Sequence, residues 1–143
     1  MAHKRLEGRV AIVTGAAQGI GAAYARALAA EGAAVCACDV LDAQPLAAQI
    51  SAAGGRAIAA HCDVTDAKSV QAMVAETVKA FGGVDILVTN AALFAGLAPK
   101  PFLEIDSAEW DQVMAVNVRG VFECVKAVAP EMRKRKYGKV INI

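Results

Sequence analysis

The sequence has hardly any excess of either charge and no apolar run long enough to cross a membrane. Its 143 residues contain 15 Lys and Arg against 14 Asp and Glu, which gives a formal net charge of +1. Without a basic excess there is no general electrostatic attraction to nucleic acid or to an anionic membrane. The first eight residues are polar and lack the apolar core of a secretory leader. We therefore expect a cytoplasmic protein without nucleic-acid or membrane partners.

Histidine is scarce, with two residues, and neither these nor the four cysteines are spaced to share a metal ion. Cys36 and Cys38 stand two residues apart, so the sequence has no C-x-x-C pair there. No metal site is expected among the candidate ligands, which are Cys36, Cys38, Cys62, Cys124, His3 and His61. The cysteines are predicted to be buried, reduced, structural thiols, as is common in a cytosolic protein.

Short apolar runs alternate with longer stretches of helical periodicity, and 57% of all residues are hydrophobic. This alternation is typical of βαβ units that build a parallel sheet. Right-handed connections then give an α/β, Rossmann-like, doubly wound parallel sheet of order 3-2-1-4-5, within one domain over residues 1–143. The strands are predicted at 9–14, 33–39, 57–62, 84–89 and 139–143, and the helices at 19–31, 42–54, 66–81 and 106 to the low 130s.

Between the first strand and the first helix the sequence reads Thr14-Gly15-Ala16-Ala17-Gln18-Gly19-Ile20-Gly21. Glycines allow a tight turn and let the main chain approach a ligand closely. The helix that follows directs unpaired N–H groups and the positive end of its dipole at the turn, which suits a pyrophosphate. A P-loop is excluded because no Lys-Ser/Thr pair follows the last glycine. Methyltransferases use similar turns, so the motif alone leaves that alternative open.

Two acidic positions narrow the ligand. Asp39 ends the second strand, about twenty residues after the turn, where this fold places a carboxylate against the adenosine ribose. A carboxylate accepts hydrogen bonds from the ribose hydroxyls and repels a 2′-phosphate, and neither Gln18 nor Val40 supplies a compensating cation. NAD is therefore favoured over NADP. Asp63 and Val64 end the third strand at the same edge, where they could meet the adenine, although an aspartate there also suits a turn or a helix cap.

These motifs together resemble the classical short-chain dehydrogenases/reductases, and the match covers essentially the whole chain. The matching residues, in order and spacing, are Thr14-Gly15-x-x-x-Gly19-Ile20-Gly21, Asp39, Cys62-Asp63-Val64, Asp85-Ile86-Leu87-Val88, Asn90-Ala91 and Asn117-Val118-Arg119-Gly120. The resemblance implies an NAD(H)-dependent oxidoreductase that transfers hydride between nicotinamide and an alcohol or ketone. It also implies a homo-oligomer, a dimer or a tetramer, in which the long helix packs at an interface.

Carried over position by position, the resemblance implies a cofactor site with three parts. The pyrophosphate and the adjacent ribose would be held by Gly15, Gln18, Gly19, Ile20 and Gly21. Asp39 would hold the adenosine ribose, Asp63 and Val64 would flank the adenine, and Asn90 and Ala91 would line the cofactor after the fourth strand.

Asn117 stands in the long helix among valines, and burial of its amide without partners would cost about 1–3 kcal/mol. A solvent-facing position is the plain alternative. The resemblance matches Asn117 to the family's active-site asparagine, which interrupts the helix and holds a water of the proton relay. The sequence departs from the family at Thr89 and Ala92, where the usual Asn-Asn-Ala-Gly reads Thr-Asn-Ala-Ala.

The resemblance also implies a tyrosine acid with a lysine four residues later, and the chain contains no such pair. Tyr24 is followed at that spacing by Leu28, and Tyr137 by Ile141. The family's serine would fall just after Ile143. We expect the chain to be the N-terminal portion of an enzyme, truncated after the fifth strand, that binds cofactor and lacks turnover. The alternative is a non-catalytic nucleotide-binding or interaction module that ends naturally at Ile143.

Overall fold

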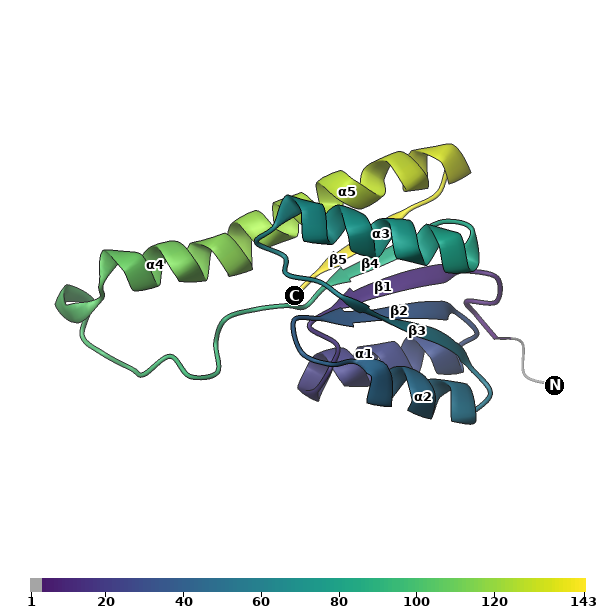
Figure 1. Ribbon diagram of the computed structural model, residues 1–143, viewed down its shortest axis with the longest axis horizontal. Helices are drawn as coiled ribbons and strands as arrows, with labels where there is room; N and C mark the ends of the chain where they lie inside the picture. The colour runs from purple at the N-terminus through teal and green to yellow at the C-terminus, as the bar shows by residue number, and fades with distance from the viewer. Residues whose placement is uncertain (1–3) are drawn as a thin grey trace.

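The computed structural model describes residues 4–143, so His3 lies outside the described residues. Five parallel strands form one sheet in the order β3-β2-β1-β4-β5, which confirms the predicted topology (Figure 1). The strands are β1 (Val10–Thr14), β2 (Ala34–Asp39), β3 (Arg56–His61), β4 (Ile86–Thr89) and β5 (Lys139–Asn142). Their carboxyl ends all meet at the same edge of the sheet, where the predicted site residues follow them.

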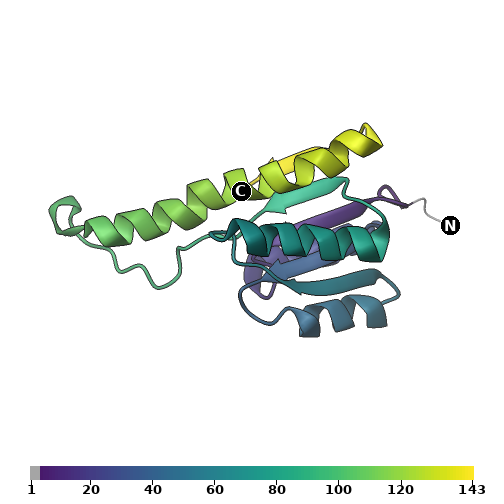
Figure 2. The same cartoon turned by 45° about the horizontal axis from the view of Figure 1, so that its top comes forward.

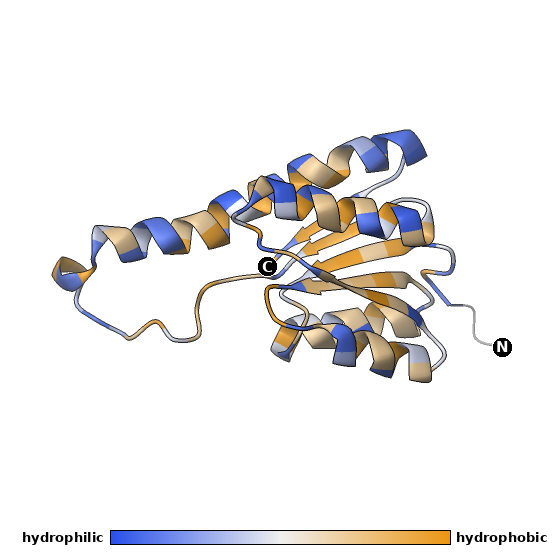
Figure 3. Cartoon of the chain, in the orientation of Figure 1, coloured by the Kyte–Doolittle hydropathy of each residue, from blue (hydrophilic) through white to orange (hydrophobic). Residues whose placement is uncertain are grey.

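Burial of the strands follows their place in the sheet. All residues of β1 and β4 are buried, and in β2 only Asp39 is partly accessible. These three strands are apolar without alternation because helices cover both of their faces, and they are the most hydrophobic part of the molecule (Figure 3). All four residues of β5 are exposed, and this strand forms one edge of the sheet.

Helices form one layer on each face of the sheet (Figures 1 and 2). The helices α1 (Gly19–Ala30) and α2 (Gln44–Ala52) cover one face, over a core that includes Val13, Ala25 and Leu46. The other face is covered by α3 (Ala67–Phe81) and α5 (Gly120–Arg135). All four cysteines lie buried and free of disulfides in the core of this second layer. Burial raises the pKa of Cys124 to about 12, which keeps that thiol protonated and unreactive at neutral pH.

The ends of the helices mostly follow the sequence signals. The Asp66 carboxylate accepts from the Lys68 N–H and caps α3, which ends at Gly82 in the left-handed conformation. The second helix begins two residues later than predicted, at Gln44. Asp42 precedes the helix, and its carboxylate accepts from the Gln44 N–H, the first of the helix, at 2.9 Å.

The long helix predicted from Asp106 is not continuous. It divides into α4 (Ser107–Met114), one π-helical turn over Ala115–Arg119, and α5. The loop before it also contains a short 3-10 turn, Phe102–Glu104. Asp106 caps α4 by accepting from the Ala108 N–H, and Glu109 in the first turn pairs with Lys100. Periodicity did not reveal the π turn, because the residues on both sides of this short turn are helical.

At the amino ends of the strands, a buried carboxylate joins three segments of the chain. Asp85 is fully buried just before β4, and its Oδ2 accepts from the Val10 N–H at 2.9 Å. Its Oδ1 lies 3.1 Å from Nε of Arg135 and 3.6 Å from Nη1 of Arg9, as ion pairs rather than aligned hydrogen bonds. The Arg9 guanidinium also stacks on the ring of Tyr137, 3.7 Å from its centre.

None of the helices described is both long and apolar enough to span a bilayer.

Candidate cofactor site

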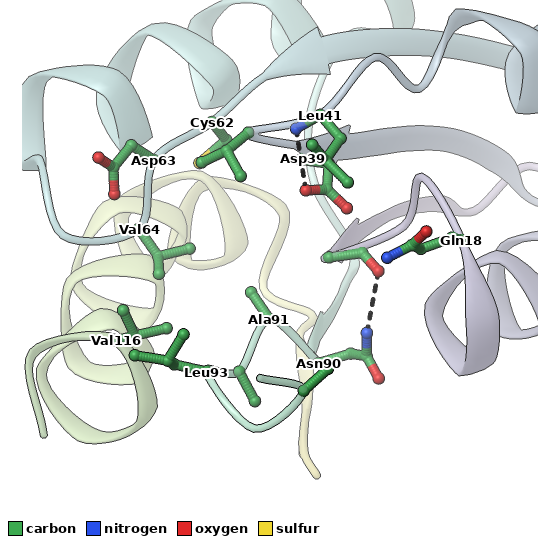
Figure 4. A pocket seen from close by; sticks show the side chains of 14 residues that line it. Gln18, Asp39, Leu41, Cys62, Asp63, Val64, Asn90, Ala91, Leu93 and Val116 are labelled. Atoms are coloured by element: carbon green, nitrogen blue, oxygen red, sulfur yellow. Dashed lines mark hydrogen bonds between the residues drawn. The ribbon is translucent and has the colours of Figure 1, made fainter. Parts of the chain in front are cut away.

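A cavity of about 400 Å³ opens at the carboxyl ends of the strands (Figure 4). A crevice at this position is where open α/β sheets bind their ligands. The residues predicted for the site that line the cavity are Gly15, Gln18, Asp39, Asp63, Val64, Asn90 and Ala91. The other lining residues, which were not assigned to the site from the sequence, are Val40, Leu41, Cys62, Ala92, Leu93, Ala95 and Val116.

The glycine turn packs so tightly that two of its glycines cannot carry a side chain. A Cβ at Gly15 would lie 2.8 Å from the Ala91 Cα, and the φ angle there is +65°. A Cβ at Gly21 would overlap the carbonyl oxygen of Gly15 and lie 2.6 Å from Nδ2 of Asn90. At Gly19, in contrast, φ is +58° but no atom lies within 4 Å of an added Cβ. Gly15 and Gly21 therefore shape the turn, while Gly19 leaves open space on its outer side.

Asn90 fastens the turn to the end of β4. Its side-chain amide donates to the carbonyl oxygens of Thr14 and Gly15, both at 3.1 Å. The bond to Gly15 is drawn in Figure 4. The Thr14 hydroxyl accepts from the N–H groups of Asn90 and Ala91, both at 3.0 Å. The sequence assigned Asn90 to the cofactor alone, whereas the structure commits its amide group to the shape of the glycine turn.

The N-terminus of α1 has no side-chain cap. Gln18 occupies the N-cap position without a capping hydrogen bond, and the first turn contains no acidic residue. The first N–H groups of a helix have no intrahelical acceptor, so here they remain available to an outside anion. Gly19 and Ile20 are exposed at this end and do not line the cavity itself, while Gly21 is buried behind Gly15.

Asp39 lies at the end of β2 with both carboxylate oxygens held by the main chain. Oδ2 accepts from the Ala17 N–H at 2.9 Å, and Oδ1 accepts from the Leu41 N–H at 3.1 Å. These bonds fix the carboxylate between the glycine turn and the cavity wall. Each oxygen keeps a second lone pair with which it can accept a further hydrogen bond.

Asp63 and Val64 form the wall after β3. Oδ1 of Asp63 accepts from the N–H and the hydroxyl of Thr65, and these bonds, the hydroxyl first, lower the pKa of the carboxyl. The carboxylate is turned away from the centre of the cavity (Figure 4), as in the turn interpretation of this aspartate. Val64 is buried and presents its side chain to the cavity together with Cys62.

Asn117 lies in the π turn and reaches the opposite wall. Its Oδ1 accepts from the Leu93 N–H at 2.7 Å, and its Nδ2 donates to the Leu93 carbonyl at 3.2 Å. The half-buried amide is thereby satisfied, so the solvent-facing alternative is wrong. Asn117 itself does not line the cavity, but Leu93 and the neighbouring Val116 do.

The chain resembles dehydrogenases over nearly its whole length. A family model described as short chain dehydrogenase matches residues 9–143. The D-threitol dehydrogenase of Mycolicibacterium smegmatis is 43% identical over 141 residues, which are 97% of this chain and 53% of that protein. An uncharacterised oxidoreductase of Mycobacterium tuberculosis is 47% identical over 138 residues, covering 95% of this chain and 56% of that protein.

A solved structure shows the same fold. The crystal structure of a dehydrogenase/reductase from Sinorhizobium meliloti matches with a TM-score of 0.88 and 38% sequence identity, covering 98% of this chain and 55% of that one. This chain thus spans about half the length of the relatives it matches. With the glycine turn, the strand-end carboxylate and the sheet order in place, the chain belongs to the short-chain dehydrogenase family.

Proposed function

We propose that the cavity binds NAD(H) and that the whole protein is an oxidoreductase acting on an alcohol or ketone. The observation that carries the proposal is the joint placement of the glycine turn, the uncapped end of α1 and the fixed carboxylate of Asp39 around one cavity. Family membership removes the methyltransferase alternative. When bound, the nicotinamide would accept or supply the hydride.

The residues present fit such a cofactor. The pyrophosphate would approach the open side of Gly19, where the helix N–H groups are free of a side-chain cap. Asp39 would accept from the hydroxyls of the adenosine ribose with its remaining lone pairs, and the apolar side chain of Val64 would contact the adenine. Asn90 and Ala91 would border the cofactor after β4, with Asn90 acting mainly by holding the turn.

We expect NADH to bind more than about tenfold tighter than NADPH. Asp39 would repel a 2′-phosphate, and none of the side chains described as lining the cavity belongs to Lys or Arg. Titration of the protein with each nucleotide by calorimetry measures the ratio. Asp39→Asn, which removes the charge and keeps the shape, is expected to bring the two affinities closer together.

Asp63→Asn is the matched control, because it removes a carboxylate from the adenine side of the same cavity. This variant is expected to leave the NADH to NADPH ratio unchanged. Tighter binding of NADPH by the unaltered protein would refute the role given to Asp39. Absence of binding by both nucleotides would refute the assignment of the cavity.

The 143-residue chain is expected to bind NADH without catalysing alcohol oxidation or ketone reduction. Tyr24, on α1, is partly buried against the core, and Tyr137 stacks against Arg9. Neither tyrosine lines the cavity, and neither has a lysine four residues later. Absorbance of NADH at saturating cofactor measures turnover over a panel of secondary alcohols, sugars and ketones. The M. smegmatis D-threitol dehydrogenase with D-threitol serves as the positive control, and turnover by the 143 residues would contradict the expectation.

Asn117 is proposed to serve the active site through its main chain. Its Oδ1 and Nδ2 both hold the main chain of Leu93, so the side chain positions that loop, whereas the resemblance implied that Asn117 holds the relay water. A π turn leaves carbonyl groups without their regular i+4 partners, and such a carbonyl near residue 117 could accept from that water. A purely nucleotide-binding role for the chain is the second candidate. Whether the coding sequence continues past Ile143 into a serine and a Tyr-x-x-x-Lys pair separates the two candidates, since only the oxidoreductase requires those residues.

The outer side of α4 and α5 supports the proposal of a homo-oligomer. Trp110, Met114, Val118 and Phe122 recur every four residues along this helix and are exposed. Such an exposed apolar stripe is typical of a protein–protein interface.

The buried, disulfide-free cysteines suit a reducing compartment, and we propose a cytoplasmic location on that ground.

A further inference from the structure

The first residue of α5 touches the wall of the cavity through its main chain. Gly120 is buried where the π turn ends, opposite the loop that connects β3 to α3. A Cβ at Gly120 would lie 2.6 Å from Cγ2 of Val64, 3.0 Å from its Cβ and 3.4 Å from its carbonyl oxygen. The helix can approach Val64 this closely only because residue 120 has no side chain.

Val64 has little freedom to yield to a larger residue. It is 6% exposed, belongs to the core under α3 and α5, and lines the cavity. Valine is branched at Cβ, so its side chain is restricted to few rotamers. A methyl group at position 120 would therefore push Val64 further into the cavity, or push the start of α5 away from the sheet.

The same short segment also fixes the opposite wall. Asn117 holds the main chain of Leu93 by two hydrogen bonds, and Val116 lines the cavity between the two contacts (Figure 4). Five residues, 116–120, thus contact the wall at Leu93 and the wall at Val64. The width of the cavity at this point depends on where the segment lies.

We propose that Gly120 is a positioning residue for the adenosine half of the dinucleotide, because its lack of a side chain sets the place of Val64. The inference rests on the proposed function, which puts the adenine against Val64. It concerns affinity for the adenosine half alone, since the glycine turn and the end of β4 lie on other elements.

The test compares Gly120→Ala with the unaltered protein by calorimetric titration with NADH and with ADP-ribose, which lacks the nicotinamide. Both ligands are expected to bind at least about tenfold more weakly to Gly120→Ala. Alanine favours a helix more than glycine does, so this loss would not come from weakening α5 itself. Thermal unfolding of the same samples shows whether the variant is folded.

Two further variants separate positioning from general damage. Val64→Ala removes the methyl group that the new side chain would meet, so the double variant Gly120→Ala/Val64→Ala is expected to recover at least about threefold in ADP-ribose affinity over Gly120→Ala. The double variant also carries the test if Gly120→Ala alone does not fold. Val125→Ala, which trims the same helix at a partly buried position away from the cavity, is expected to bind ADP-ribose as the unaltered protein does.

The remaining outcomes would contradict the inference alone or the inference together with the proposed function. If the unaltered protein binds both ligands and Gly120→Ala binds them equally well, the inference is wrong and the proposed function stands. If Gly120→Ala loses affinity and Val64→Ala restores none of it, the loss does not pass through Val64 and the inference is wrong. If the unaltered protein binds neither ligand, the proposed function fails and the inference fails with it.

Discussion

Gly21→Ala is expected to destabilise the protein by roughly 3 kcal/mol and to abolish measurable NADH binding. The new methyl group would overlap the carbonyl oxygen of Gly15 and press on the amide of Asn90. Both neighbours are fixed, the first because it is main chain and the second because it donates to Thr14 and Gly15. Relief therefore requires the whole turn to move away from α1, and the turn is the part that would meet the pyrophosphate.

Gly19→Ala is the matched comparison, two residues away in the same turn. Space for the methyl group is open at Gly19, so its cost to stability is the left-handed conformation alone, about 1–2 kcal/mol for a residue with a side chain. The methyl group would occupy the space through which the ligand approaches. Gly19→Ala is thus expected to stay folded and to lose most of its NADH affinity.

Urea unfolding and calorimetric titration on both variants measure the two effects separately. The ratio of stability loss to affinity loss should be high for Gly21→Ala and low for Gly19→Ala. If Gly21→Ala were as stable as the unaltered protein, the tight packing of the turn would be disproved. If Gly19→Ala bound NADH normally, the pyrophosphate would not lie on the outer side of the turn.

Much of this fold could be predicted because local signals and tertiary context agree. The central strands are continuous apolar runs bounded by turn residues, and Val70, Met73 and Val74 place the buried side of α3 at helical spacing. Gly15 and Asp39 could be found because each marks a strand end in a parallel sheet. Parallel strands bring such ends to one edge, so the order of the strands was enough to gather these residues at one site.

The rest depended on contacts between distant segments. Nothing near Asn90 in the sequence indicates that its amide reaches back to Gly15, 75 positions earlier. Leu93 and Val116 resemble ordinary apolar residues, and they line the cavity only because the loop and the π turn meet there. The interruption at Asn117 was implied by the family resemblance, while helical periodicity alone predicted one unbroken helix.

The site is assembled from segments whose positions are set elsewhere in the molecule. The cavity borders the ends of β1, β2, β3 and β4, so their relative alignment determines its shape. At the opposite end of the sheet, Asp85 ties the start of β1 to β4 and to the end of α5. The Lys139 N–H also donates to the Asp85 main-chain oxygen at 2.9 Å, which aligns β5. Asp85 therefore helps to align β1 and β5 with β4, the first through its carboxylate and the second through its main chain, without lining the cavity.

Asp85→Ala is expected to lower the free energy of unfolding by roughly 3 kcal/mol, because it leaves the buried Val10 N–H without its acceptor and removes the partner of two guanidinium groups. Arg9→Ala and Arg135→Ala should each cost only about 1 kcal/mol, since both side chains are partly exposed and Asp85 would keep the other partner. Urea unfolding at neutral pH measures all three values.

Because the carboxylate lies at the amino ends of the strands and the cavity at their carboxyl ends, folded Asp85→Ala should bind NADH within about threefold of the unaltered protein. A stability loss below about 1 kcal/mol would show that solvent can replace the buried pairs, and a selective loss of NADH affinity would show that the strand ends are coupled along their length.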